Sequence, residues 1–169
     1  MYADLKIPKA RVAVLIGKKG VGKRFLEKKL KVKIRVDKEG EVQIEGEGID
    51  AMVAQRIVRA IGRGFNPKIT LLLQHDTYHM EIVQIKDFAH SAADVARIKA
   101  RMIGTKGKAW KMLERLLEVD ISVYGNTVSI IGEAEKIELA KQAVEKLLQG
   151  SPHGKVYIFI EKQKKIHLE

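Results

Sequence analysis

Hydrophobic and polar residues alternate along two stretches of the chain, and in each stretch a short polar turn separates two alternating runs. The first stretch covers residues 32–44 with its turn at 37–40, and the second covers residues 119–130 with its turn at 124–126. Strict alternation is typical of a half-buried strand, and a turn between two such runs indicates an antiparallel hairpin. The pattern therefore predicts two β-hairpins, one in each half of the chain.

Segments with apolar residues at helical spacing surround each predicted hairpin. A long amphipathic helix is expected after each one, with its apolar positions at 53–61 in the first half and at 137–148 in the second. Shorter helices are expected on both sides of a Gly-x-x-Gly sequence that precedes each hairpin. In the second half, Ser91 and Asp94 form a capping-box start for one of these helices.

The two halves repeat one sequence pattern. Shifting the chain by 87 positions places Ile16–Gly20 on Ile103–Gly107, and the apolar positions of the two hairpins then match as well. A repeat of this length suits a small domain and is too long for a solenoid unit. With leading strands expected at 3–7 and 80–85, each copy reads strand, helix, Gly-x-x-Gly, helix, strand, strand, helix. The chain is therefore predicted to be an α+β protein that arose by tandem duplication.

This division predicts four parts: a first domain at 1–66, an interdomain segment at 67–78, a second domain at 79–150, and a C-terminal strand and basic tail at 151–169. The interdomain segment contains the apolar run Ile69–Leu73 and is expected to pack, either against one domain or at the interface between the two. Residues 155–160 have the composition of a strand, which is expected to join the edge of a sheet. Residues 162–165 are expected to form a frayed, solvated end.

Composition narrows the classes of function. The chain has 169 residues, no cysteine and a formal net charge of +11, with an isoelectric point near 9.8. Without cysteine it cannot hold disulfides, thiolate metal sites or a cysteine nucleophile. No apolar run approaches the ~20 residues that span a bilayer, and the N-terminus has no signal-peptide core, so a soluble, cytoplasmic protein is expected.

Positive charge is concentrated in the first half. Residues 1–75 contain 17 Lys and Arg against 8 Asp and Glu, a net charge of +9, whereas residues 76–169 contain 15 against 13, a net charge of +2. Such an excess fits a polyanionic partner such as RNA, DNA or an acidic membrane surface. A solvated lysine-rich surface without any such partner explains the same numbers.

The helix–Gly-x-x-Gly–helix elements carry the most specific chemistry in the sequence. Glycines let the main chain approach phosphates without a Cβ in the way, and the following helix directs its N-terminal N–H groups toward them. Lysines in the loop add charge without selecting a base. One such loop is weak support for nucleic-acid binding, but two copies in the same arrangement of strands and helices are strong support.

A competing motif overlaps the first loop, because Gly17–Lys23 also spells the body of a phosphate-binding P-loop. Arg24 stands where a P-loop has the Ser or Thr that binds Mg²⁺. The second copy keeps the Gly-x-x-Gly and loses the rest of the P-loop pattern. An ATPase that uses Lys23 is therefore the weaker interpretation.

Two other features have ordinary structural explanations. Trp110 is spaced from Leu113 and Leu117 as a core residue on one helix face, and base stacking is its alternative role. His75, His79 and His90 have no carboxylate pattern of the metalloprotease type near them, so no metal site or cofactor is expected.

With both loops placed, each half resembles a type I KH domain, a three-stranded antiparallel sheet packed with three helices. In KH domains the loop clamps the backbone of about four nucleotides, whose bases lie over a hydrophobic floor. The resemblance implies RNA contacts from the loops, the residues beside them and one floor isoleucine in each copy. These candidates are Gly17, Lys18, Lys19, Gly20, Lys23, Arg24 and Ile34 in the first copy, and Gly104, Thr105, Lys106, Gly107, Lys108, Lys111 and Ile121 in the second.

The whole chain resembles archaeal members of the partner-of-Nob family of small-subunit ribosome biogenesis factors. Beyond the loops, the resemblance rests on residues 60–67 and 152–160. It implies binding of single-stranded RNA near the 3′ end of small-subunit rRNA. It further implies, as partners, the endonuclease that trims that end, an rRNA dimethyltransferase and the alpha subunit of translation initiation factor 2. One departure is that Lys23 and Trp110 occupy positions where KH domains usually have an inward-facing isoleucine.

The sequence thus favours a non-enzymatic RNA-binding protein, with the second loop slightly preferred as the main site. A nucleotide-hydrolysing P-loop protein and a KH-fold scaffold for other proteins remain as alternatives.

Overall fold

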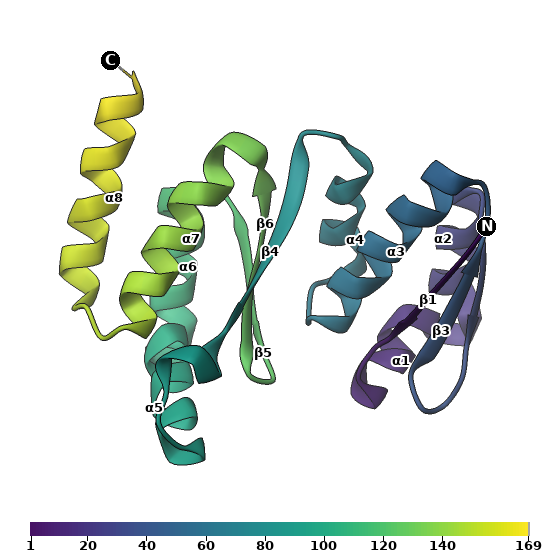
Figure 1. Ribbon diagram of the computed structural model, residues 1–169, viewed down its shortest axis with the longest axis horizontal. Coiled ribbons are helices and arrows are strands. Elements are labelled where there is room, and N and C mark those ends of the chain that lie inside the picture. The colour runs from purple at the N-terminus through teal and green to yellow at the C-terminus, as the bar shows by residue number, and fades with distance from the viewer. Residues whose placement is uncertain (169) are drawn as a thin grey trace. The chain divides into compact units, whose positions relative to one another are not determined.

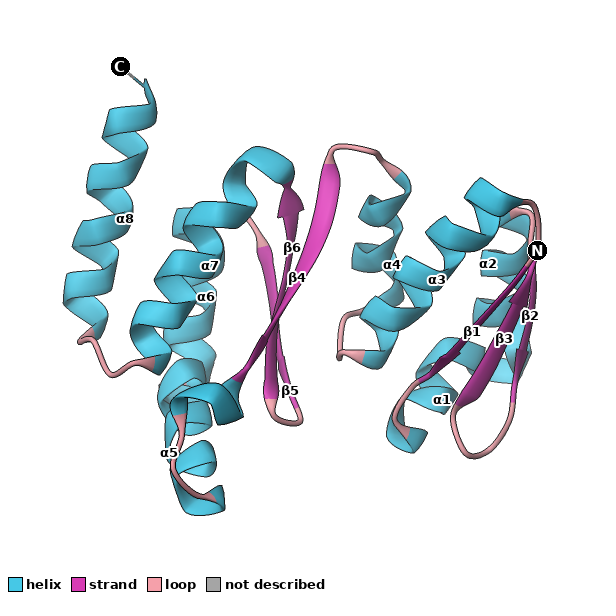
Figure 2. Cartoon of the chain, in the orientation of Figure 1, coloured by secondary structure: helices cyan, strands magenta, loops and turns pink. Residues whose placement is uncertain are grey.

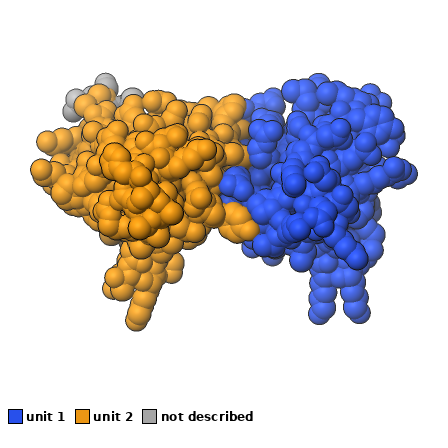
Figure 3. Space-filling model, turned by 60° about the horizontal axis from the view of Figure 1, so that its bottom comes forward, with its two compact units in different colours: residues 1–76 blue, residues 77–169 orange. Residues whose placement is uncertain are grey.

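The computed structural model describes residues 1–168, with side chains through Ile166. It divides into two compact units, the first from Met1 to Asp76 and the second from Thr77 onward (Figure 3). Each unit contains one three-stranded sheet and its own covering helices (Figure 2).

The first unit follows the predicted order of elements (Figure 1). Its sheet has the antiparallel order β1-β3-β2, so β2 is an edge strand. Ile34, Val42 and Ile44 point into the core, and the alternating positions of these strands are exposed. The elements are β1 (Tyr2–Lys6), α1 (Lys9–Ile16), α2 (Val21–Leu30), β2 (Lys33–Val36), β3 (Glu41–Glu45) and α3 (Gly48–Gly62).

The second unit repeats this arrangement. Its sheet has the antiparallel order β4-β6-β5, with β5 at an edge. The elements are β4 (Tyr78–Gln84), α5 (Ala92–Ile103), α6 (Lys108–Leu117), β5 (Asp120–Tyr124), β6 (Thr127–Glu133) and α7 (Ala134–Leu148). The prediction of two α+β domains, each a three-stranded antiparallel sheet packed with three helices, is confirmed for these elements, and each unit has one further α-helix that is described below.

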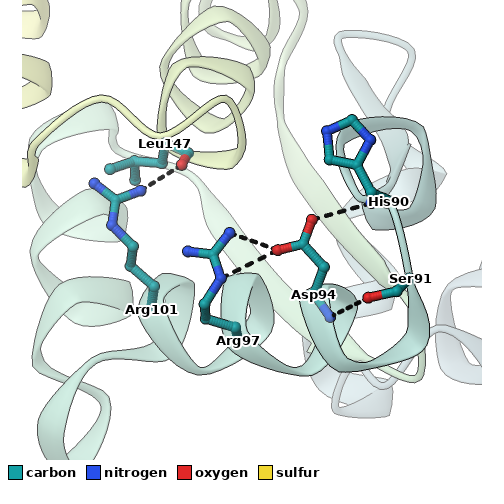
Figure 4. A network of polar contacts seen from close by, with 6 residues as sticks. All are labelled: His90, Ser91, Asp94, Arg97, Arg101 and Leu147. Atoms are coloured by element: carbon teal, nitrogen blue, oxygen red, sulfur yellow. Dashed lines mark hydrogen bonds and ion pairs between the residues drawn. The ribbon is translucent and has the colours of Figure 1, made fainter.

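Polar contacts fix the start and the end of α5 (Figure 4). The Ser91 hydroxyl accepts a hydrogen bond from the Asp94 N–H at 3.1 Å, and the Asp94 carboxylate accepts one from the His90 N–H at 3.0 Å. The Ser91 cap is as predicted, and the return bond from Asp94 reaches His90, one residue before the N-cap. Near the other end of the helix, Arg101 Nη1 donates to the Leu147 carbonyl at 2.6 Å, which ties α5 to the end of α7.

The apolar segment after α3 folds onto the first unit. It forms α4 (Pro67–Thr70) and a 3₁₀ turn, η2 (Leu71–Gln74). Asn66 caps α4 by accepting a hydrogen bond from the Lys68 N–H at 2.9 Å. Leu73 is buried, and Arg56 on α3 donates to its carbonyl at 3.2 Å. The segment is thus packed, as its composition predicts.

The C-terminal segment differs from its prediction, because residues 153–168 form a helix, α8 (His153–Leu168), and not a strand followed by a solvated tail. The β-rich composition of residues 155–160 is overridden by packing, since Val156 and Ile160 are buried one helical turn apart against α6 and α7. In a strand, Ile158 would share their face, yet its side chain is 58% exposed.

Among the described helices, none is long and apolar enough to cross a membrane.

We expect Ile160→Ala to destabilise the second unit by about 2–4 kcal/mol, because it removes a fully buried side chain. The matched control, Ile158→Ala, removes an exposed isoleucine from the same helix and should cost less than about 0.5 kcal/mol. Chemical denaturation measures both. Equal losses would indicate a strand-like face and contradict the helix.

Candidate nucleic-acid interface

The two Gly-x-x-Gly loops have the same backbone conformation. Gly17 and Gly104 have φ of +75° and +74°, and the second glycines, Gly20 and Gly107, have φ of +76° and +74°. The third position of each loop, a lysine in both copies, is also left-handed, with φ of +56° and +54°. Left-handed φ is costly for a lysine, so the same strained turn is built twice.

The first glycine of each loop is required by space as well as by φ. A Cβ on Gly17 would lie 2.7 Å from the backbone nitrogen of Gly22, and a Cβ on Gly104 would lie 2.9 Å from that of Ala109. A Cβ on Gly107 would meet nothing within 4 Å. The first glycine therefore lets the loop fold against the start of the next helix.

The loops present exposed polar and cationic side chains beside the N-termini of α2 and α6. Arg24 lies next to the first loop, since a Cβ on Gly20 would come within 3.0 Å of its Nη1. The exposed members of the predicted set at these positions are Lys18, Lys19 and Arg24 in the first unit and Thr105, Lys106, Lys108 and Lys111 in the second. The structure brings each group together around its own loop.

The Lys23 side chain forms hydrogen bonds within the first unit. Its Nζ donates to the Ile34 carbonyl at 3.0 Å and to Glu27 Oε1 at 3.3 Å. The side chain thus reaches from α2 to the open edge of β2, where it satisfies a carbonyl that no strand pairs. This placement accounts for a lysine where KH domains usually have an isoleucine.

A glutamate that the sequence reasoning missed caps the same strand edge in both units. Glu27 Oε2 accepts a hydrogen bond from the Ile34 N–H at 3.0 Å, and Glu114 Oε2 accepts one from the Ile121 N–H at 2.9 Å. The signal was present in the repeat, because the 87-residue shift superimposes the two glutamates. These carboxylates link α2 to the edge strand β2 in the first unit and α6 to the edge strand β5 in the second.

The predicted floor residues contribute less side-chain surface than expected. Ile34 is 1% exposed and Ile121 is 3% exposed, because both point into the cores. What they present outward is backbone at an open strand edge. A base that reached either strand edge would meet this backbone and the glutamate bonded to it.

The P-loop interpretation does not match this geometry. A P-loop follows a strand, whereas residues 12–16 belong to helix α1. Gly22 packs against Gly17, and the ammonium group of Lys23 is bonded to Ile34 and Glu27. The first loop is built as a Gly-x-x-Gly turn between two helices.

Trp110 packs against the core of the second unit, which confirms that interpretation over base stacking. Within the described residues, no three His, Asp or Glu side chains lie together in a way that could hold a metal ion.

Comparisons with known proteins agree with this architecture. A family model for the eukaryotic-type (type I) KH domain, specific to the second KH domain of PNO1, matches residues 79–165, and a general KH-domain model matches residues 3–60. KH domain-containing protein MJ0443 of Methanocaldococcus jannaschii is 48% identical over 165 residues, which cover 95% of this chain and 73% of that protein. The chain belongs to the PNO1/Dim2 family of KH-domain proteins.

Solved structures of this family match nearly the whole chain. One is from the crystal structure of an a/eIF2alpha–aDim2p–rRNA complex of Pyrococcus horikoshii; it is 43% identical, with a TM-score of 0.90, and the match covers 98% of this chain and 94% of that one. The RNA-binding protein pno-1 of Caenorhabditis elegans is 31% identical over 82% of this chain and 49% of its own length. The PNO1 match extends to residue 165, so most of α8 lies inside the second-domain family pattern.

We expect Gly104→Ala to destabilise the second unit by about 2–5 kcal/mol, because the new methyl group adds a backbone clash to the left-handed strain. Gly107→Ala introduces the strain alone and should cost about 1–2 kcal/mol. Denaturation of the two variants side by side measures the difference. Equal costs would mean that the close approach to Ala109 does not constrain the loop.

The glutamate cap predicts a pH dependence. Burial raises the pKa of Glu114 above its ordinary value near 4.5 and outweighs the hydrogen bond from Ile121. A carboxyl group whose pKa is raised on folding stabilises the fold while it is protonated, and this contribution is complete below its pKa in the unfolded chain. The contribution is lost as pH rises through the pKa of the folded state. Glu114→Gln keeps an acceptor for the Ile121 N–H and removes the charge. Its stability relative to wild type should therefore increase between pH 4 and pH 7.

Glu118→Gln is the control of opposite sign. The Lys136 ammonium, 3.1 Å from its carboxylate, lowers the pKa of Glu118, so its contribution is present above the unfolded pKa and lost as pH falls. The relative stability of this variant should decrease between pH 4 and pH 7. Parallel pH profiles for the two variants would contradict the assigned shifts.

Proposed function

We propose that this protein binds single-stranded rRNA during maturation of the small ribosomal subunit, near the 3′ end of that RNA, and that the second Gly-x-x-Gly loop is its main clamp. The observation that carries the proposal is the duplicated loop, with the same backbone angles in two KH folds of a family whose relatives include a Dim2p–rRNA complex. Curated relatives named pre-rRNA-processing protein PNO1 support the same process.

In the proposed mechanism the protein binds and does not catalyse. Loop N–H groups and exposed lysines hold successive phosphates, and the close-packed glycines let the RNA backbone approach the main chain. The unstacked bases then turn toward the edge strand of the sheet. Phosphate contacts set the position of the RNA, and base contacts at this edge select its sequence.

The two strand edges favour the second unit as the main site. In the first, the Ile34 N–H and carbonyl are both bonded to side chains of α2, namely Glu27 and Lys23. In the second, Glu114 bonds the Ile121 N–H, while Trp110 stands at the position of Lys23 and has no ammonium group to offer the carbonyl. A base that pairs with the strand edge must displace both the glutamate and the lysine contact in the first unit, but only the glutamate contact in the second.

The proposal includes protein partners. The Pyrococcus horikoshii relative was crystallised with a/eIF2alpha and rRNA, which supports the alpha subunit of initiation factor 2 as a partner of this chain. The endonuclease that trims the rRNA and the rRNA dimethyltransferase follow from the family resemblance alone.

The test reverses the loop charges one domain at a time. We expect Thr105→Asp/Lys106→Asp to weaken binding of a single-stranded RNA decamer by on the order of 10- to 100-fold at ~0.15 M salt. Lys18→Asp/Lys19→Asp changes the same two positions of the first loop and removes one more unit of positive charge, yet it should weaken binding only several-fold, through the loss of general attraction. Fluorescence anisotropy measures affinity, and thermal melting shows that each variant is folded.

A larger loss from the first-loop variant would move the main site to the first unit. No loss from either variant, with both folded, would overturn RNA clamping and leave the loops to a protein partner. A crosslink map onto total RNA tests the location near the 3′ end of small-subunit rRNA independently of both variants.

A further inference from the structure

Helix α8 gives the second unit a surface that the first unit lacks. It packs against α6 and α7 (Figure 1), and Lys164 Nζ donates to the Leu116 carbonyl of α6 at 2.9 Å. Met112 on α6 is partly covered there. The equivalent residue of the first unit, Phe25, is 53% exposed.

Two neighbouring hollows run along the seam between α6 and α8. The first is lined by Gly104 and Thr105 of the clamp loop and reaches Met112 and Tyr157. The second begins at Met112 and Tyr157 and ends at Lys165. Because they share two residues, they form one open groove that starts at the clamp. This α6–α8 groove is defined by Thr105, Lys108, Met112, Tyr157, Lys162 and Lys165.

The charge of the groove suits a polyanion. Lys108, Lys162 and Lys165 are exposed along it, and Glu161 is the single acidic residue among those that line it. The net charge of the chain from residue 76 onward is only +2, so this alignment of lysines is a local feature. Between them lie apolar and aromatic side chains, the composition that binds single-stranded nucleic acid.

An aromatic pair is fixed at the start of the groove. Arg101, one turn before the clamp, donates to the Leu147 carbonyl (Figure 4) and to the Ser151 carbonyl. Its own carbonyl accepts from His153 Nε2 at 3.1 Å. The Tyr157 ring lies 6.3 Å from the His153 ring, tilted by 54°. The start of α8 is thus tied to the end of α5, which holds Tyr157 beside the loop.

We propose that the α6–α8 groove is an extension of the RNA site, which takes the nucleotides that leave the second clamp, stacks one base on Tyr157 and holds the following phosphates with Lys162 and Lys165. This inference rests on the proposed function, since the groove is continuous with the clamp. It gives the second domain a longer footprint on single-stranded RNA than the loop alone provides.

The test uses the full chain and a ten-nucleotide single-stranded RNA selected from a random pool, together with a series shortened from each end to four nucleotides. Wild type should lose affinity when the nucleotides beyond the clamp are removed. Tyr157→Leu should bind the decamer on the order of tenfold more weakly. Lys162→Glu/Lys165→Glu should flatten the slope of log affinity against log salt by about 1.4 for the decamer. Both variants should bind the shortest RNA as wild type does.

Two controls separate the outcomes. Tyr157→Phe keeps the ring and should keep decamer affinity, whereas equal loss from the Phe and Leu variants would assign the effect to the hydroxyl and contradict base stacking. Lys28→Glu/Lys29→Glu makes the same charge change on α2 of the first unit and should leave the length dependence intact.

If the groove variants retain the full advantage of the decamer while the second-loop variant loses affinity, the groove proposal fails and the clamp stands. The groove would then fit a protein partner better. If the second-loop variant also retains affinity, the proposed function itself fails.

Discussion

The close approach between the first loop glycine and the residue five positions later is the contact on which each site depends. Gly17 against Gly22 and Gly104 against Ala109 leave no room for a Cβ, so the chain reverses sharply and the second helix starts directly behind the loop. This position sets the direction of α2 and α6. Their side chains then reach the open edge of β2 or β5, where Glu27 and Glu114 accept the outward N–H groups. The Gly-x-x-Gly loop and the strand edge are therefore positioned relative to each other by the helix that connects them.

The duplicated units share this construction and differ in what surrounds it. The change from Lys23 to Trp110 removes a cation from the strand edge and places an indole against the core. The addition of α8 turns the exposed flank of the second helix into a lined groove. Both differences lie beside the second loop, one on the side of the edge strand and one on the side of α8.

Much of the fold and of the candidate site could be predicted from the sequence, because each local pattern could be checked against its copy in the repeat. The hairpins, the paired loops and the helix cap at Ser91 follow from spacing and were correctly predicted. Helix α8 was missed because Val156–Ile160 has the composition of a strand, while its structure is decided by the burial of Val156 and Ile160 against helices that are distant in sequence. The caps by Glu27 and Glu114 were missed for a related reason. From the sequence alone, a glutamate on a helix is expected to be solvated, and only the fold shows that a strand edge lies beside it.

Net charge and site location are separate properties in this chain. Residues 1–75 carry +9, yet the lysine nearest the first strand edge is used internally, on the Ile34 carbonyl. Residues 76–169 carry +2, yet exposed lysines flank the second clamp and continue along α8. Within about 10 Å, the screening distance at physiological salt, the local arrangement of charges determines how a phosphate is held, whereas the total charge governs attraction from farther away. In the proposed function, the strongly basic half would thus supply long-range attraction, and the nearly neutral half would hold a defined stretch of the RNA.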